Sequence, residues 1–426
     1  MAVSHVPVPG TARFSLAALP PLSLYIHIPW CVRKCPYCDF NSHEIRVANT
    51  KTTSAAQQIS FTEPVRPQLA SSDLPETEYI RCLIADLEQT LPKIWGRRIA
   101  TIFFGGGTPS LFSAQAIDTL LSAVRARLTL DPEAEITLEA NPGTFEIEKF
   151  RDFRAAGINR LSVGIQSFNA THLHALGRIH NADEAKRAID IAQTYFDNIN
   201  LDLMYGLPAQ TLAECVADID TALSYAPAHL SLYHLTLEPN TLFHRFPPAL
   251  PDDELAADMQ AMITQKLRAA GYDHYETSAY AQPEKRSRHN LNYWRFGDYV
   301  GIGAGAHGKI SFPDRIVREV RYKQPKTYMQ QALQGMAIQE SKDVSPHELP
   351  FEFMMNALRL ADGFQMALFT ERTGLPITII KRELAIAESR GLLIRDHLKI
   401  QPTERGRLFL NDLLQIFLSP VESQAG

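Results

Sequence analysis

Residues 22 to about 240 alternate between short β-branched or aromatic runs and longer amphipathic segments, and this alternation limits the fold most. Apolar residues recur at intervals of three and four in the longer segments, which is the period of a helix. Strand and helix repeated in this way predict parallel strands joined by right-handed crossovers. Since such strands close into a barrel at eight, six strands predict an α/β fold built on a partial (β/α)6 barrel of the TIM type. The expected strands are Leu24–Ile28, Thr101–Phe104, Ile136–Glu139, Arg160–Ile165, Ile199–Met204 and Leu230–Leu237.

The same patterns predict the domain boundaries. The expected barrel covers residues 22–245 and follows an N-terminal tail of residues 1–21. Between 43 and 76 the sequence turns to Ser, Thr, Gln, Ala and Pro, which predicts a mobile insertion. Beyond the barrel the alternation ends, so residues 246–340 are expected to form a linking region. Helical patterns followed by a short hairpin predict a C-terminal winged-helix-like domain at 341–420, with a packing or lid role.

Composition excludes several classes of protein. The 426 residues include 42 basic and 47 acidic side chains, so a formal net charge of −5 gives no general attraction to nucleic acid. The uncharged run from Phe14 to Trp30 is interrupted by prolines and is too short for a membrane span. Three of the five cysteines fall within eight residues, which suits metal ligation in a reducing compartment better than disulfides. We therefore expect a cytoplasmic protein that does not bind nucleic acid.

Cys31, Cys35 and Cys38 form the sharpest motif and follow the first expected strand directly. Three thiolates from one loop can converge on one inorganic centre, because soft sulfur ligands favour iron–sulfur clusters, zinc or copper(I). If they hold three irons of a four-iron cluster, the fourth iron stays open for a chelating ligand. The alternative is a zinc site completed by His27 or His43, since structural zinc prefers four protein ligands. The position of the loop at the end of a barrel strand favours the cluster.

Further candidate residues fall where other expected strands end. Gly105–Thr108 closes the second strand, and its missing side chains would let backbone groups approach a ligand closely. A tight turn is the alternative explanation of that segment. Glu139 ends the third strand and can accept hydrogen bonds from ribose hydroxyls. Gln166 and Asp202 end the fourth and fifth strands, and Arg178 follows the fourth, so these polar groups are expected at one rim.

These motifs together resemble the radical S-adenosylmethionine (radical SAM) superfamily, whose C-x3-C-x2-C loop occupies this position. The closer resemblance is to the subgroup of the oxygen-independent (anaerobic) coproporphyrinogen III oxidase and the HemW haem chaperones, over nearly the whole chain. The segments that carry the resemblance are Tyr25–Pro29, Gly105–Pro109, Glu139–Gly143, Val163–Phe168, Gly177–His180 and Asn200–Pro208.

The resemblance implies that the three cysteines bind a [4Fe-4S] cluster with S-adenosylmethionine (SAM) at its open iron. In the family, an electron from the cluster cleaves SAM into methionine and a 5′-deoxyadenosyl radical, while the protein supplies orientation and a water-poor pocket. The glycine-rich segment is expected to receive the methionine part of SAM. The residues carried over as SAM contacts are Tyr25, Tyr37, Gly106, Gly107, Thr108, Glu139, Gln166, Arg178 and Asp202.

Two departures favour the chaperone over the oxidase. The oxidase-type loop continues to a further cysteine two residues after Cys38, where this chain has Phe40, and the segment before the first strand is short. The chaperone interpretation implies that the protein binds haem and delivers it to membrane-associated respiratory haemoproteins, without oxidising coproporphyrinogen III. The oxidase remains the enzyme alternative, and a zinc-stabilised interaction module is a third hypothesis.

His289 is the predicted haem ligand, in the sequence His289-Asn-Leu-Asn-Tyr293-Trp294. Haem iron commonly takes an axial imidazole, and flanking aromatic residues supply an apolar surface for the macrocycle. The pattern resembles the H-N-x-x-Y-W sequence associated with haem binding in HemW proteins. His307, within a glycine-rich segment, is the weaker candidate. The family resemblance also suggests a homodimer, for which the sequence names no interface.

Overall fold

The fold is described for residues 15–45, 74–143 and 149–418 by a computed structural model. Its six parallel barrel strands each overlap the run predicted from the sequence, and each pairs in parallel with the next. The predicted partial (β/α)6 barrel is therefore confirmed. The strands are β1 (Leu22–Ile28), β4 (Arg98–Gly106), β5 (Thr129–Ala140), β6 (Arg160–Gln166), β7 (Ile199–Tyr205) and β8 (His229–His234).

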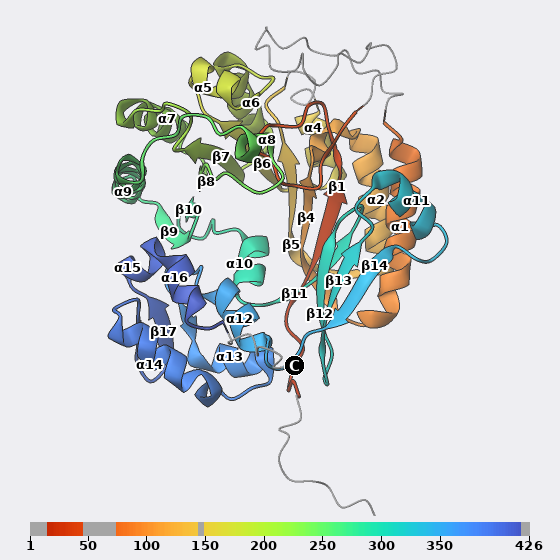
Figure 1. Cartoon of the computed structure of the whole chain (residues 1–426). Coiled ribbons are helices and arrows are strands. Elements are labelled where there is room, and N and C mark those ends of the chain that lie inside the picture. The colour runs from red at the N-terminus through yellow and green to blue at the C-terminus, as the bar shows by residue number, and fades with distance from the viewer. Residues whose placement is uncertain (1–14, 46–73, 144–148, 419–426) are drawn as a thin grey trace, which may run out of the picture.

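Amphipathic helices follow these strands and cover the outer side of the barrel (Figure 1). Their apolar stripes join the strands in one large buried cluster, and burying one large apolar side chain contributes about 1.5–3 kcal/mol. Capping boxes begin two of the helices, at Asn181 and at Thr211. The helices are α1 (Glu76–Thr90), α2 (Ala114–Arg127), α4 (Phe150–Ala156), α5 (Ala170–Ala175), α6 (Ala182–Tyr195) and α7 (Leu212–Ser224).

Residues 246–340, expected to form a linking region, widen the barrel sheet at both edges, so that this sheet has twelve strands among the described residues. At one edge, β11 pairs in parallel with β1, and three antiparallel strands continue from it. We call these four strands the sheet extension: β11 (Asp298–Ile302), β12 (His307–Ser311), β13 (Ile316–Arg321) and β14 (Ile338–Asp343). At the other edge lie β10 (Ala279–Ala281) and β9 (Asp273–Glu276). The same region supplies α9 (Asp253–Ala269), α10 (Arg288–Trp294) and α11 (Pro325–Ala332).

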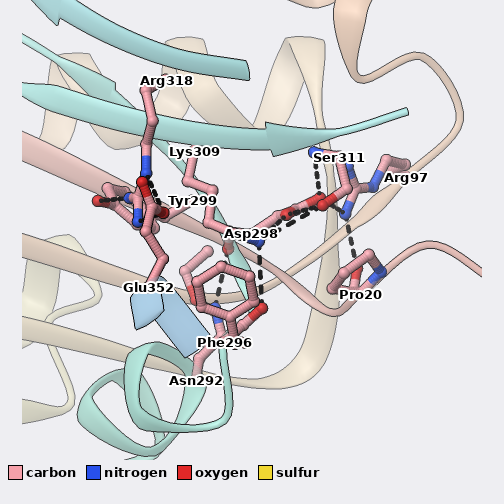
Figure 2. A network of polar contacts seen from close by, with 11 residues as sticks. Pro20, Arg97, Asn292, Phe296, Asp298, Tyr299, Lys309, Ser311, Arg318 and Glu352 are labelled. Atoms are coloured by element: carbon pink, nitrogen blue, oxygen red, sulfur yellow. Dashed lines mark hydrogen bonds and ion pairs between the residues drawn. The ribbon is translucent and has the colours of Figure 1, made fainter. Parts of the chain in front are cut away.

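Buried ion pairs hold the sheet extension to the barrel, as Figure 2 shows. The Asp298 carboxylate, fully buried, accepts a hydrogen bond from the Lys309 ammonium at 2.9 Å and pairs with the Arg97 guanidinium at 2.8 Å. Burial alone would raise the pKa of Asp298, but the two cations outweigh it and lower the pKa. A second buried pair, Arg321 with Asp86 at 3.2 Å, ties β13 to α1. The extension therefore depends on charge pairing, since an unpaired buried charge costs several kcal/mol.

The C-terminal region forms its own core and lies together in the blue part of Figure 1. Phe353 is fully buried there and contacts the rings of Phe296, Phe364 and Phe369. Helices followed by a hairpin agree with the winged-helix-like pattern. The elements are α12 (Leu349–Ala357), β15 (Phe364–Gln365), α13 (Met366–Thr373), α14 (Lys381–Ser389), β16 (Leu393–Arg395), β17 (Lys399–Pro402), α15 (Glu404–Leu408) and α16 (Leu410–Gln415).

Most of the predicted tail and insertion, residues 1–14 and 46–73, lies outside the described residues. The ends of the expected insertion range belong to β3 (His43–Glu44) and to the start of α1. In the part of the chain that the structure describes, no helix is both long and apolar enough to cross a membrane.

Candidate functional site

The three cysteines lie on the loop that follows β1, at the carboxyl end of the barrel, and all three are half-buried. Cys31 ends β2 (Trp30–Cys31), and the Cys38 amide donates to the Cys35 carbonyl at 3.1 Å, which makes a tight turn. Burial raises the pKa of Cys31 to about 11. Among the described residues, no group of three or more His, Cys, Asp or Glu side chains is arranged to hold a metal ion. Ligation would therefore exchange the present thiol contacts for bonds to metal.

A chain of hydrogen bonds runs from Cys31 to Cys35 across the rim of the barrel. The Thr108 hydroxyl donates to Cys31 Sγ at 3.6 Å and accepts from the Asn141 amide at 2.9 Å. The Arg178 guanidinium donates to Asn141 Oδ1 at 2.6 Å and to Cys35 Sγ at 3.7 Å. Segments that follow β4, β5 and β6 thus meet the cysteine loop. Donors aimed at sulfur stabilise its charged form, which is the form that binds metal.

Gly106 and Gly107 bring the end of β4 against the cysteine-bearing segment. A Cβ at Gly107 would lie 2.5 Å from the carbonyl oxygen of Trp30, so only glycine fits there. Gly106 has φ +116°, and a Cβ there would lie 2.6 Å from the His27 ring. Its amide donates to the Glu139 carboxyl at 3.2 Å. Close packing against the Trp30 backbone therefore explains Gly107, and the positive φ together with the His27 ring explains Gly106. These reasons stand beside the close approach of a ligand that the sequence suggested.

Polar groups of the next strands lie near one another: Glu139 is the penultimate residue of β5 and Gln166 ends β6, whereas Asp202 lies in the middle of β7 and not at its end as predicted. Burial, together with the Asp202 charge, raises the pKa of Glu139 to about 8. Burial also raises the pKa of Asp202, although Ser162 donates to its carboxyl at 2.8 Å. Gln166 has φ +69°, a left-handed conformation that costs about 1–3 kcal/mol and is typical of functional sites.

His27 and Asn41 connect the cysteine loop to the barrel and to the sheet extension. Because a carbonyl oxygen can only accept, His27 Nε2 donates to the Asn41 carbonyl at 2.9 Å, and Nδ1 accepts from the Tyr25 hydroxyl at 3.0 Å. The Asn41 side chain donates to the carbonyls of Ala304 and Lys323, at 2.9 Å each. Both ring nitrogens of His27 are thus engaged, which argues against the alternative in which His27 completes a zinc site. No motif marked Asn41 in the sequence.

A cavity of about 700 Å³ lies between the barrel rim, the cysteine loop, α10 and the sheet extension. A volume of this size fits a cofactor. Its aromatic lining residues are Tyr25, Phe40, Tyr293, Trp294 and Tyr299. Its titratable lining residues, apart from the tyrosines, are Lys34, Asp39, Glu139, His27, His307, Lys309, Arg318 and Lys323.

The predicted SAM residues therefore fall into three groups. Tyr25, Gly106 and Glu139 line the cavity. Thr108 and Arg178 contact the cysteines directly. Tyr37 also contacts Cys35 through its hydroxyl and packs against Phe243. Of the others, Gly107 packs against Trp30, Gln166 ends β6 and Asp202 lies within β7.

The two histidines predicted for haem differ in their access to the cavity. His289 is only 1% exposed, with Nδ1 2.7 Å from the Thr101 hydroxyl and Nε2 3.1 Å from the Tyr293 hydroxyl. Burial, and to a lesser extent Arg160, lowers its pKa to about 3, so the ring is neutral. His307 begins β12, lines the cavity and is exposed.

Comparison with known proteins agrees with this architecture. Residues 25–222 match the Radical SAM superfamily model, and residues 344–409 match the HemN C-terminal domain model. The protein named Heme chaperone HemW from Escherichia coli is 48% identical over 95% of this chain and 100% of its own length. Its counterpart from Haemophilus influenzae is 47% identical, over 94% and 99%.

Two more distant proteins extend the comparison. Radical S-adenosyl methionine domain-containing protein 1, mitochondrial, from Bos taurus is 34% identical over 98% of this chain and 90% of its own length. The solved structure of coproporphyrinogen III oxidase (HemN) from Escherichia coli superposes with a TM-score of 0.74 at 22% identity, covering 94% of this chain and 90% of that one. That likeness concerns the fold.

Proposed function

The chain belongs to the HemW family of haem chaperones within the radical SAM superfamily, and we propose that it uses a [4Fe-4S] cluster and SAM beside its haem site. The hydrogen-bond chain from Cys31 through Thr108, Asn141 and Arg178 to Cys35 carries this proposal. It directs one donor at each of two sulfurs, and such hydrogen bonds stabilise the thiolate form and tune the potential of a bound cluster. Because a haem chaperone hands its haem to other proteins, we also propose recipient haemoproteins as its partners.

Cys31, Cys35 and Cys38 would hold the cluster, because three soft donors on one loop suit three irons and leave the fourth open. Such a cluster supplies one electron to bound SAM. Of the chain's own residues, Thr108 donates to the sulfur of Cys31 and Arg178 to that of Cys35, and these contacts hold the loop to the barrel.

We assign SAM to the barrel side of the cavity. Gly106, Gly107 and Thr108 lie next to the cysteine segment, where the methionine part would bind. Glu139 is set to contact the ribose, and its raised pKa lets it donate as well as accept hydrogen bonds near neutral pH. The remaining proposed contacts are Tyr25, Tyr37, Gln166, Arg178 and Asp202.

We assign haem to the other side of the cavity, where Tyr293 and Trp294 supply aromatic surface. His289, the ligand that the sequence predicts, could bind iron only if its Nε2 gave up the contact with the Tyr293 hydroxyl. We further propose a cytoplasmic protein, consistent with five free cysteines, that delivers haem to respiratory proteins at the membrane surface and forms homodimers during cluster assembly.

Product analysis separates this function from that of the oxidase. The reconstituted full chain, with SAM and a reductant under anaerobic conditions, is given coproporphyrinogen III, with a known oxidase as the positive control. We expect no decarboxylated product, and haem bound by the same preparation. Formation of protoporphyrinogen IX would overturn the proposal in favour of the oxidase. One zinc and no iron in the reconstituted protein would favour the interaction module.

A further inference from the structure

One face of the sheet extension forms a wall of the cavity and brings a second imidazole to it. Lys309 lies opposite Tyr299 on β11 and opposite Arg318 on β13. Because side chains alternate along a strand, His307 lies on the same face as Lys309. All four residues line the cavity. A ligand in this cavity would therefore contact His307 of β12.

The segment before His307 is held firmly in place. Gly303 and Gly305 have φ of +107° and +79°, and the Asn41 side chain binds the Ala304 carbonyl at 2.9 Å. The Ala304 amide donates to the Tyr79 hydroxyl, also at 2.9 Å. A rigid segment that is tied to the cysteine loop positions the imidazole without a large loss of entropy on binding.

The His307 ring itself is available to a ligand. Within the described part of the chain, no hydrogen bond engages this ring, whereas both nitrogens of His289 are engaged. Partial burial, with the charges of Lys323 and Arg318, lowers the pKa of His307 against the opposing effect of Glu340. The ring is therefore neutral at pH 7, which is the form that binds iron.

Charge at the same cavity suits an anionic ligand. Two of its cations are already neutralised, since Arg318 pairs with Glu352 at 2.6 Å and Lys309 pairs with Asp298 at 2.9 Å. Among the described residues, Lys323 forms no ion pair, and its side chain is exposed at the cavity. An available ammonium beside a neutral imidazole and several aromatic rings is the chemistry that recognises a metalloporphyrin with carboxylate side chains.

We infer that His307, in place of the predicted His289, would bind the haem iron in this cavity and that Lys323 would bind a haem carboxylate. The inference rests on the proposed function. His289 then acts as a positioning residue that holds the Tyr293 hydroxyl in the cavity wall.

Absorption titration of the full chain with ferric haem tests the iron ligand. In His307→Ala we expect loss of the histidine-ligated haem spectrum and ~10- to 100-fold weaker binding. Added imidazole should restore the spectrum, which a purely structural role would not allow. His397→Ala, at an exposed position between β16 and β17, is the matched control and should bind like the wild type.

A histidine-ligated spectrum retained in His307→Ala but lost in His289→Ala would overturn the inference and leave the proposed function intact. Failure of the wild-type chain to bind haem would overturn both. Loss of binding in His307→Ala without rescue by imidazole would also count against His307 as the ligand.

The carboxylate contact has its own test, with haem and its uncharged dimethyl ester as probes. Lys323→Ala should weaken the binding of haem by roughly fivefold and leave the binding of the ester unchanged. Lys326→Ala, an exposed lysine of α11 outside the cavity, is the control. Equal effects of Lys323→Ala on both probes, or no effect on haem, would overturn this assignment.

Discussion

The barrel and the sheet extension share one sheet but are stabilised differently. The barrel strands are parallel, mostly apolar and covered by helices, so burial of side chains such as Leu24 and Ile26 holds them. The extension strands beyond β11 are antiparallel and bury charged residues in pairs, such as Asp298 with Lys309. The cavity lies between the two regions. The cavity therefore has one wall held by apolar burial and one wall held by buried charge pairs.

The largest expected effect tests the barrel side. Replacing Cys31, Cys35 and Cys38 together by alanine should abolish the absorption of a [4Fe-4S] cluster after anaerobic reconstitution, because no sulfur ligand then remains on the loop. Iron and sulfide analysis of the purified protein measures the loss. Cys215→Ala, far from the loop in the buried core, should keep the cluster. A cluster that survives the triple replacement would refute the assigned ligands.

The next effect tests the extension. Asp298→Asn should lower the free energy of unfolding by about 3–5 kcal/mol, because Lys309 would be left as a buried cation without its carboxylate. Urea denaturation of the full chain measures this change. Asp314→Asn removes an exposed pair with Arg315 and should change stability by less than about 1 kcal/mol. Equal effects of the two variants would show that buried charge pairing does not hold the extension.

A smaller effect is expected where the barrel meets the cysteine loop. Gly107→Ala would force a Cβ against the Trp30 carbonyl, so we expect a loss of about 1–3 kcal/mol in stability and a lower cluster content. Denaturation and iron content are measured on the same preparation. At Gly308 the nearest atom to a Cβ is 3.4 Å away, an ordinary contact, so Gly308→Ala is the matched control. Full cluster content in Gly107→Ala would contradict the packing role.

The smallest effect concerns pH. Because the pKa of Glu139 is raised from 4.5 to about 8, the folded chain holds a proton that the unfolded chain has lost within this range. The contribution of Glu139 to the free energy of unfolding therefore falls as the pH rises from 4.5 to 8. Relative to the wild type, Glu139→Gln should gain stability across this window in the absence of cofactors. Glu133→Gln, at the exposed start of the same strand, is the control. A constant difference across the window would contradict the raised pKa.

The barrel was predicted well from the sequence because each strand is marked by a pattern of apolar residues within the strand itself. Apolar alternation located every barrel strand, and the ends of those strands located residues such as Glu139 and the three cysteines. The reason for Gly107 was not visible, since it depends on the Trp30 backbone meeting the end of a distant strand. Family resemblance, more than spacing, favoured the cluster over zinc.

The sheet extension could not be predicted in the same way. Charged residues such as Lys309 and Arg321 interrupt its apolar pattern, and their partners lie far away or on other strands. Asn41 gave no signal, because its role depends on the carbonyl of Ala304, more than 200 residues further along the chain. Sequence ranked His289 above His307 by motif alone, and it could not show that His289 is almost completely buried.

The most direct test of the central claim is transfer of haem from the full chain to an apo-haemoprotein. The chain, loaded with haem and carrying its cluster, is mixed with the acceptor, and the spectrum of each protein is followed after separation. The account predicts that haem leaves this chain, appears in the acceptor and restores its activity. Haem that stays on the chain, or enters the acceptor no faster than free haem does, would contradict it.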